Sequence, residues 1–240
     1  MATYVLVHGG AHGGWCYQKV ARLLRAAGHD VYTPTLTGLG ERSHLLSSDV
    51  DLSLHIDDIA NVLFHEDLTD VVLVGHSYGG MVITGVADRA NDRVGRLVYL
   101  DAANPRNGQA LTDVDGGGIA ATRPFGKVVD GVELVLLPET GQFYGVEDPA
   151  QRDWMRARLT GHPWKCFEQP LSLEHEDALW AIPQYHIVCT STVRGRTRRD
   201  PELMKRARAE GRLWEIDTGH DLMITEPQVV ADTLEKVLSS

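Results

Sequence analysis

The chain has 240 residues, of which 43% are apolar, and a formal net charge of −10. This length suits one large domain, or one domain with an insertion, and it buries enough surface to fold without disulfides or a structural metal. An acidic surface repels nucleic acids and anionic membranes, so neither is expected as a partner. One basic run, with eight Lys or Arg residues between Arg194 and Arg212, is expected to be a solvated loop and helix face.

The three cysteines, Cys16, Cys166 and Cys189, are widely spaced, and no two of them form a C-x-x-C pair. This favours free thiols in a reducing compartment over a disulfide framework. No charged leader with an apolar stretch precedes the first strand, and no apolar run has the length of a membrane span. These features predict a cytoplasmic location. They leave the oligomeric state open, and a homo-oligomer is compatible with them.

The first hundred residues alternate between strand and helix patterns. Strands are predicted at 3–7, 30–33, 70–74 and 95–100, and helices near 15–27, 52–64 and 78–91. Such alternation predicts an α/β fold, in which helices cover both faces of a parallel sheet. Ligands of such sheets bind at the carboxyl ends of the strands.

The alternation stops near residue 102 and resumes near residue 183. A strand at 185–189, a helix at 202–209, a strand at 212–216 and a last helix from Glu226 then complete the pattern. We therefore predict a mostly parallel, six-stranded core formed by residues 1–101 and 183–240. Residues 102–182 are predicted to form a helical lid, inserted after the fourth strand. Its aromatic residues, which either line a site or form the core of the lid, are Phe125, Phe143, Tyr144, Trp154, Trp164, Phe167 and Trp180.

The most informative motif is Gly75-His76-Ser77-Tyr78-Gly79, which lies between a predicted strand and a predicted helix. A sharp strand-to-helix turn of this kind strains the serine backbone and exposes the hydroxyl above the sheet edge. Glycines flank the serine because side chains would collide in so tight a bend. Ser77 is therefore predicted to be a nucleophile, and the alternative is a glycine-rich turn with an inert serine.

A nucleophilic serine needs a base to remove its proton, and the base needs an anionic partner. His220 is the predicted base, because it follows the strand at 212–216 and so lies at the same sheet edge as Ser77. His76 is expected to point elsewhere. The loop after the next-to-last strand holds no carboxylate, and Asp200 is expected to cap the helix that follows it. Asp101, at the tip of the strand beside the nucleophile strand, is the predicted acid, with a turn-capping role as the alternative.

Two backbone N–H groups are needed to stabilise a tetrahedral oxyanion. One is predicted to be the amide of Tyr78, and the other to come from the glycine-rich loop at 8–15. Neither this loop nor Gly38-Leu39-Gly40 has the G-x-G-x-x-G spacing of a dinucleotide site, and no Walker sequence is present, so no nucleotide cofactor is predicted. The histidines form no H-E-x-x-H pattern, so no catalytic metal is predicted. The expected partner is a small-molecule substrate.

On these motifs the chain resembles the α/β-hydrolases over essentially its whole length. Within that fold it is similar to the plant methylesterase and hydroxynitrile lyase group, and to small bacterial esterases and carbamate hydrolases. The resemblance implies that the amide of Gly10 is the first oxyanion donor. The segments that carry the resemblance are 5–15, 27–31, 75–80 and 219–223.

Two departures from the plant enzymes bear on the function. Those enzymes carry an aspartate after the penultimate strand, where this chain has Thr192. The segment 97–102 instead looks like that of haloalkane dehalogenases whose acid follows the strand after the nucleophile, which supports Asp101. The lyases use a threonine and a lysine at the positions of Gly9 and Asp221, so hydrolysis is favoured. The resemblance implies a serine hydrolase for small esters or carbamates, with a lyase or a non-catalytic receptor as alternatives.

Overall fold

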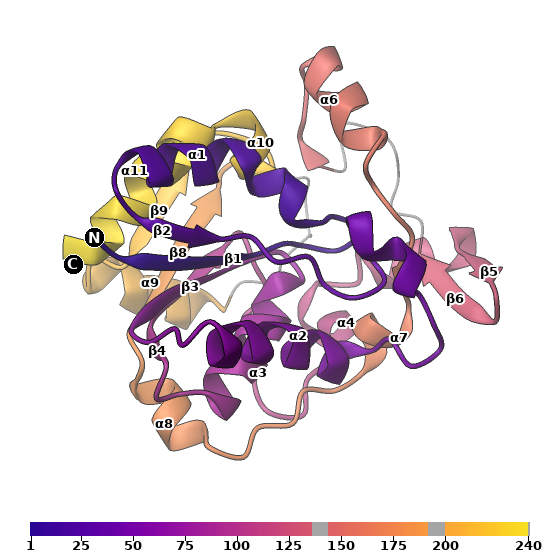
Figure 1. The fold of residues 1–240 in the computed structure, drawn as a ribbon, viewed down its shortest axis with the longest axis horizontal. Coiled ribbons are helices and arrows are strands. Elements are labelled where there is room, and N and C mark those ends of the chain that lie inside the picture. Colours follow the sequence, from indigo (N-terminus) through magenta and orange to yellow (C-terminus); the bar gives the residue numbers. More distant parts are fainter. Residues whose placement is uncertain (136–143, 192–199, 240) are drawn as a thin grey trace.

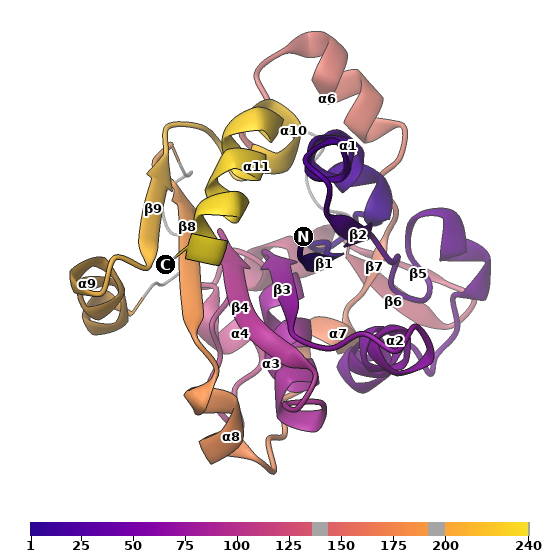
Figure 2. The ribbon, with the colours of Figure 1, turned by 60° about the vertical axis from the view of Figure 1, so that its left-hand side comes forward.

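The computed structural model describes residues 1–135, 144–191 and 200–239. Phe143, Thr192 and the first part of the basic run that begins at Arg194 lie outside these described residues. The described chain forms three layers, in which helices cover both faces of a six-stranded sheet (Figures 1 and 2). None of the helices in these ranges has both the length and the apolar character needed to cross a bilayer.

The strands of this sheet follow the spatial order β2-β1-β3-β4-β8-β9, and every neighbouring pair is parallel. The predicted α/β fold with six core strands is therefore confirmed. The strand order reverses between β1 and β3, so the loops after these two strands diverge and leave a crevice at the carboxyl edge. The strands are β1 (Thr3–Val7), β2 (Asp30–Tyr32), β3 (Val71–His76), β4 (Val94–Leu100), β8 (Gln184–Cys189) and β9 (Leu213–Ile216).

The two faces of the sheet are covered by different pairs of helices. Helix α1 packs with α11 on one face, and α2 packs with α3 on the other (Figure 2). With helices on both sides, β3 is buried along its whole length, which explains its continuous apolar sequence. The helices of the core are η1 (Gly14–Tyr17), α1 (Gln18–Ala26), η2 (Gly40–Leu45), α2 (Leu52–His65), α3 (Gly79–Arg89), α9 (Pro201–Ala209), α10 (Leu222–Thr225), α11 (Pro227–Lys236) and η4 (Val237–Ser239).

Local sequence signals set the ends of these helices. Asp51 caps α2 by accepting a hydrogen bond from the Leu54 amide at 3.0 Å. Asp200 caps α9, as predicted, and accepts from the Glu202 amide at 2.9 Å. The Asp200 carboxylate is therefore engaged at the start of a helix that packs on β8 and β9.

The chain leaves the sheet after β4 and returns to it at β8. Most of the intervening elements gather beyond the carboxyl ends of the core strands, whereas α8 packs on α3 (Figure 1). They include a small antiparallel sheet, β5-β6-β7, which differs from the helical lid that we predicted. Asp130 and Gly131 join β5 to β6 with φ values of +50° and +81°, the hairpin geometry that an Asp-Gly pair favours. The elements are α4 (Leu111–Val114), η3 (Ala120–Phe125), β5 (Lys127–Val129), β6 (Val132–Val135), α6 (Pro149–Arg156), β7 (His162–Pro163), α7 (Lys165–Glu168) and α8 (Glu176–Ala181).

Candidate active site

The turn between β3 and α3 holds Ser77 at the carboxyl edge of the sheet. Its φ is +54°, a left-handed conformation that costs a non-glycine residue roughly 1–2 kcal/mol. Glycines make room for this turn. A Cβ on Gly75 would lie 2.5 Å from the Gly79 carbonyl oxygen, and a Cβ on Gly79 would lie 2.8 Å from the Val7 carbonyl oxygen. The strained strand-to-helix turn expected from the sequence is therefore present.

His220 follows β9, Asp101 follows β4, and their side chains meet. His220 Nδ1 lies 2.6 Å from Asp101 Oδ2, and both residues are buried. The Asp101 amide donates to the Ile187 carbonyl at 2.7 Å, which ties the end of β4 to β8. The Asp101 carboxylate also accepts from the Cys189 amide at 3.2 Å, through Oδ1, and from the Cys189 thiol at 3.0 Å, through Oδ2. These contacts orient the carboxylate toward the imidazole.

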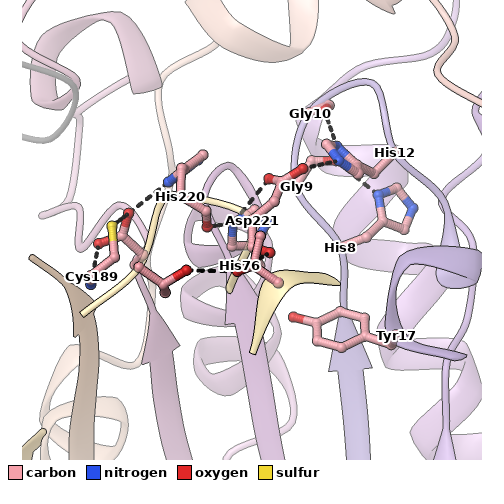
Figure 3. A network of polar contacts seen from close by, with 12 residues as sticks. His8, Gly9, Gly10, His12, Tyr17, His76, Cys189, His220 and Asp221 are labelled. Carbon is pink, nitrogen blue, oxygen red and sulfur yellow. Dashed lines mark hydrogen bonds and ion pairs between the residues drawn. The ribbon is translucent and has the colours of Figure 1, made fainter. Parts of the chain in front are cut away.

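His76 lies beside His220, although the sequence led us to expect that it would point elsewhere. The two ring centroids are 4.6 Å apart, and His76 Nε2–H donates to the His220 carbonyl at 2.9 Å (Figure 3). Burial, and next the proximity of His220, lower the pKa of His76 to about 3. His76 is thus a neutral ring whose N–H holds the backbone of His220. It supports the loop that carries His220, the predicted base.

One cavity brings all the predicted site residues together. The space between its lining atoms, part of which is open to solvent, is about 640 Å³. Of the aromatic residues in the described part of residues 102–182, Tyr144 and Phe167 line it, whereas Phe125, Trp154, Trp164 and Trp180 do not. The lining residues from the core are Gly10, His12, His76, Ser77, Tyr78, Asp101 and His220, and those from the following segment are Ala103, Leu111, Asp115, Gly118, Ile119, Tyr144 and Phe167.

Gly10 and Tyr78 line this cavity, and their amides have no acceptor among the described residues. Both residues are buried, yet neither amide donates a hydrogen bond to any described part of the chain. Buried backbone N–H groups are seldom left without an acceptor. The Tyr78 side chain is held in place by His55, whose Nδ1 lies 2.9 Å from the Tyr78 hydroxyl. The two amides are therefore available to an oxygen atom of a bound ligand.

Two histidines hold the loop that carries Gly10 (Figure 3). His8 Nδ1–H donates to the Gly9 carbonyl at 2.8 Å, while its Nε2 accepts from the Leu36 amide at 3.1 Å. Burial lowers the pKa of His8 to about 3, so this ring is neutral. His12 Nδ1 lies 2.7 Å from the Gly10 carbonyl oxygen. His8 and His12 are four residues apart, a metal-ligand spacing on a helix, but here they belong to an irregular loop and their nitrogens are engaged.

Three groups of described residues place possible metal-ligand atoms within 4.8 Å of one another. In each group some of these atoms already form hydrogen bonds, such as His55 Nδ1 with Tyr78 and His220 Nδ1 with Asp101. We assign a metal to none of them. The groups are His55–His162–Cys166, His76–His220–Asp221 and Asp101–Cys189–His220.

Three partners of the site were missed by reasoning from the sequence. Cys189 orients the predicted acid, and His12 bonds to Asp221, with His12 Nε2 3.0 Å from Asp221 Oδ2. The sequence signal that pointed to His12 and Asp221 was their closeness to predicted site residues. His12 follows Gly10 by two residues, and Asp221 follows His220 directly. Nothing in the sequence shows that the first and last loops meet.

The strand order, the strained serine turn and the cavity at the carboxyl edge together define an α/β-hydrolase. Residues 4–233 match the Alpha/beta hydrolase family, and the chain belongs to that family. Its relatives are named as esterases and hydrolases, so it is an α/β-hydrolase of the esterase type.

Two relatives and one solved structure illustrate the similarity. The chain is 42% identical to a carbendazim hydrolyzing esterase of Nocardioides sp. (strain SG-4G), over 72% of this chain and 74% of that protein. It is 25% identical to methylesterase 1 of Arabidopsis thaliana, over 98% of this chain and 95% of that protein. The fold is also that of an extracellular α/β-hydrolase from a Paenibacillus species, with a TM-score of 0.81, 24% identity and 98% of each chain covered.

Proposed function

We propose that the protein is a serine esterase that cleaves small esters or carbamates through an acyl-enzyme intermediate. The observation that carries this proposal is the 2.6 Å contact between His220 Nδ1 and Asp101 Oδ2 in the wall of the cavity that Ser77 lines. A carboxylate that accepts from Nδ1–H leaves the other ring nitrogen, Nε2, without a proton. That nitrogen is then able to take the proton of a serine hydroxyl.

The reaction proceeds in two halves. Ser77 Oγ attacks the substrate carbonyl while its proton moves to His220 Nε2, and the amides of Gly10 and Tyr78 bind the oxyanion. The tetrahedral intermediate collapses, and the alcohol leaves with the proton from His220. Water, deprotonated by the same imidazole, then attacks the acyl-enzyme and releases the acid. Asp101 holds the Nδ1–H tautomer and stabilises the imidazolium in both halves. No cofactor takes part.

The walls of the cavity favour a small and largely apolar substrate. Leu111, Ile119 and Phe167 supply apolar surface to the cavity that the polar groups of the core also line. We also propose that residues 102–182 act as the lid of the site, since the elements that supply these side chains lie beyond the strand ends. Carbendazim, named for one relative, and methyl esters, named for others, are the first substrates to test.

The test combines a substrate panel with active-site labelling. Wild-type protein is assayed on short-chain, methyl and aryl esters and on carbamates, and is treated with a fluorophosphonate probe. Ser77→Ala is expected to abolish both turnover and labelling, whereas Ser172→Ala, at an exposed serine, is expected to leave both unchanged. Full activity of Ser77→Ala would refute the proposal. Cyanide release without ester cleavage would identify a lyase, and absence of labelling would identify a receptor.

A further inference from the structure

A buried pair of side chains joins the two loops on either side of the nucleophile. His12 lies in the loop after β1, and Asp221 lies in the loop after β9. His12 Nε2 is 3.0 Å from Asp221 Oδ2, and neither side chain is more than 1% exposed. The other ring nitrogen of His12, Nδ1, lies 2.7 Å from the Gly10 carbonyl oxygen. Figure 3 shows this network beside His220 and His76.

Both nitrogens of His12 therefore face oxygen atoms that accept hydrogen bonds. A neutral imidazole has one N–H and serves one acceptor, whereas an imidazolium serves both. Burial by itself lowers the pKa of His12, but the charge and hydrogen bond of Asp221 and the Gly10 carbonyl raise it overall. Burial by itself raises the pKa of Asp221, but His12 lowers it overall. The pair is thus an imidazolium and a carboxylate.

The titratable groups around the pair do not compete for this charge. Burial keeps the pKa of His8, His76 and His162 below the ordinary value, so these rings are neutral. Burial also raises the pKa of the nearby Cys16 and Tyr17, which therefore stay protonated. The Tyr144 ring packs edge-on against His12, with centroids 5.4 Å apart. Asp221 Oδ1 faces His76 Nε2 at 3.9 Å, and His220 is the adjacent residue.

The pair controls the backbone around Gly10. A trans peptide is planar, so the carbonyl and the amide of one peptide unit point in opposite directions. His8 holds the Gly9 carbonyl, which turns the Gly10 amide of the same unit away from His8. His12 holds the carbonyl of the next unit. The two peptide units that meet at Gly10 are therefore both fixed, one by a neutral ring and one by a charged ring.

We propose that His12, as an imidazolium with Asp221 as its counter-ion, is a positioning residue that fixes the Gly10 amide relative to His220. The inference rests on the proposed function, which gives that amide the role of oxyanion donor. The ion pair connects the loop of the donor to the residue next to the base, so its loss frees the two loops to move apart. Asp221 stands at the position where the lyases use a lysine. It thus supplies an anion to the loop that carries His12, and it supplies no cation to the cavity.

The test measures the charge of His12 and the effect of its counter-ion on turnover. Histidine side-chain NMR of the ¹⁵N-labelled wild type is expected to show protons on both His12 nitrogens at about pH 8. Asp221→Asn removes the charge and is expected to leave His12 neutral. Its kcat on the best ester is expected to fall about 10- to 100-fold with KM changed less than about threefold, because oxyanion donors act in the transition state. The split between kcat and KM is the readout that a merely structural role would not move.

Glu235→Gln is the matched control, since Glu235 faces His29 at 3.4 Å at the opposite end of the sheet. It is expected to leave kcat unchanged. A single proton on wild-type His12, or a folded Asp221→Asn with kcat within about threefold of the wild type, would overturn the inference. If Asp221→Asn does not fold, His12→Gln/Asp221→Asn offers a neutral pair for the kinetic measurement. Failure of the serine mechanism is recognised separately. In that case the fluorophosphonate probe does not label Ser77, whereas NMR still shows protons on both nitrogens of His12.

Discussion

Replacing Asp101 with asparagine reverses the hydrogen bond that the predicted base depends on. An asparagine has one acceptor oxygen, and the Cys189 amide, 3.2 Å from Oδ1, requires it. The asparagine NH₂ group then takes the place of Oδ2, which lies 2.6 Å from His220 Nδ1. His220 Nδ1 must accept from that group, so the ring proton moves to Nε2. An imidazole in this tautomer cannot take the proton of Ser77.

The structure also disfavours the flipped orientation of the asparagine amide, which would restore the hydrogen bond to His220. A flipped amide would return its oxygen to His220, but it would leave the Cys189 amide facing an NH₂ group, which costs about 1–3 kcal/mol. The flipped form is therefore a minority, and it lacks the charge that stabilises the imidazolium. We expect kcat to fall about 10³- to 10⁴-fold, close to the effect of the same exchange in a serine protease. This corresponds to about 4–5.5 kcal/mol of transition-state stabilisation.

The assay is steady-state hydrolysis of an activated ester, with thermal melting to verify the fold. Asp217→Asn is the matched control, because this exposed carboxylate precedes His220 by three residues but accepts from the Thr190 hydroxyl at 2.8 Å. It is expected to keep kcat within about twofold. Asp101 is not the acid if the folded Asp101→Asn variant retains more than about a tenth of the wild-type kcat. A loss of activity in Asp217→Asn would also contradict the assignment.

Three further predictions concern stability and the turn. The pKa of His8 and of His76 is about 3 in the folded protein, against 6.5 in the unfolded chain. The unfolded chain thus binds more protons below pH 6.5, so stability is lost as the pH falls from 6.5 toward 3. Between pH 6.5 and 5.0 the two rings together lower the free energy of unfolding by about 3 kcal/mol. In urea melts, the free energy that the wild type loses over this range is expected to exceed the loss in His76→Gln by about half of that amount. Equal losses in the two proteins would contradict the lowered pKa of His76. Gly75→Ala directs a methyl group at the Gly79 carbonyl, 2.5 Å away, so we expect at least about 1–3 kcal/mol of destabilisation and reduced fluorophosphonate labelling. Unchanged melting and labelling would show that the turn tolerates a side chain. Asp200→Ala removes a helix cap and should cost about 1 kcal/mol in a thermal melt, with no change in kcat; a large loss of kcat would instead point to Asp200 as the acid.

The sequence alone determined the order of the strands and main helices of the core and the position of the serine turn. Both follow from local physics, because apolar periodicity fixes strands and helices and because only glycine fits two positions before and two positions after Ser77. The strand predicted at 95–100 is observed as Val94–Leu100, so the apolar pattern by itself places Asp101 at a strand tip. The small antiparallel sheet between β4 and β8 was missed, since its strands are two to four residues long and carry little periodicity.

Only the tertiary structure decided which side chains meet. His12 and Asp221 are more than 200 positions apart, and their contact depends on the placement of β1 and β9 in one sheet and on the loops that follow them. Likewise, the Cys189 thiol became a partner of Asp101 because β8 lies beside β4. Local patterns carry no information on such distant pairings. The hydrogen bonds that fix them form only after strands that are distant in the sequence have paired in the sheet.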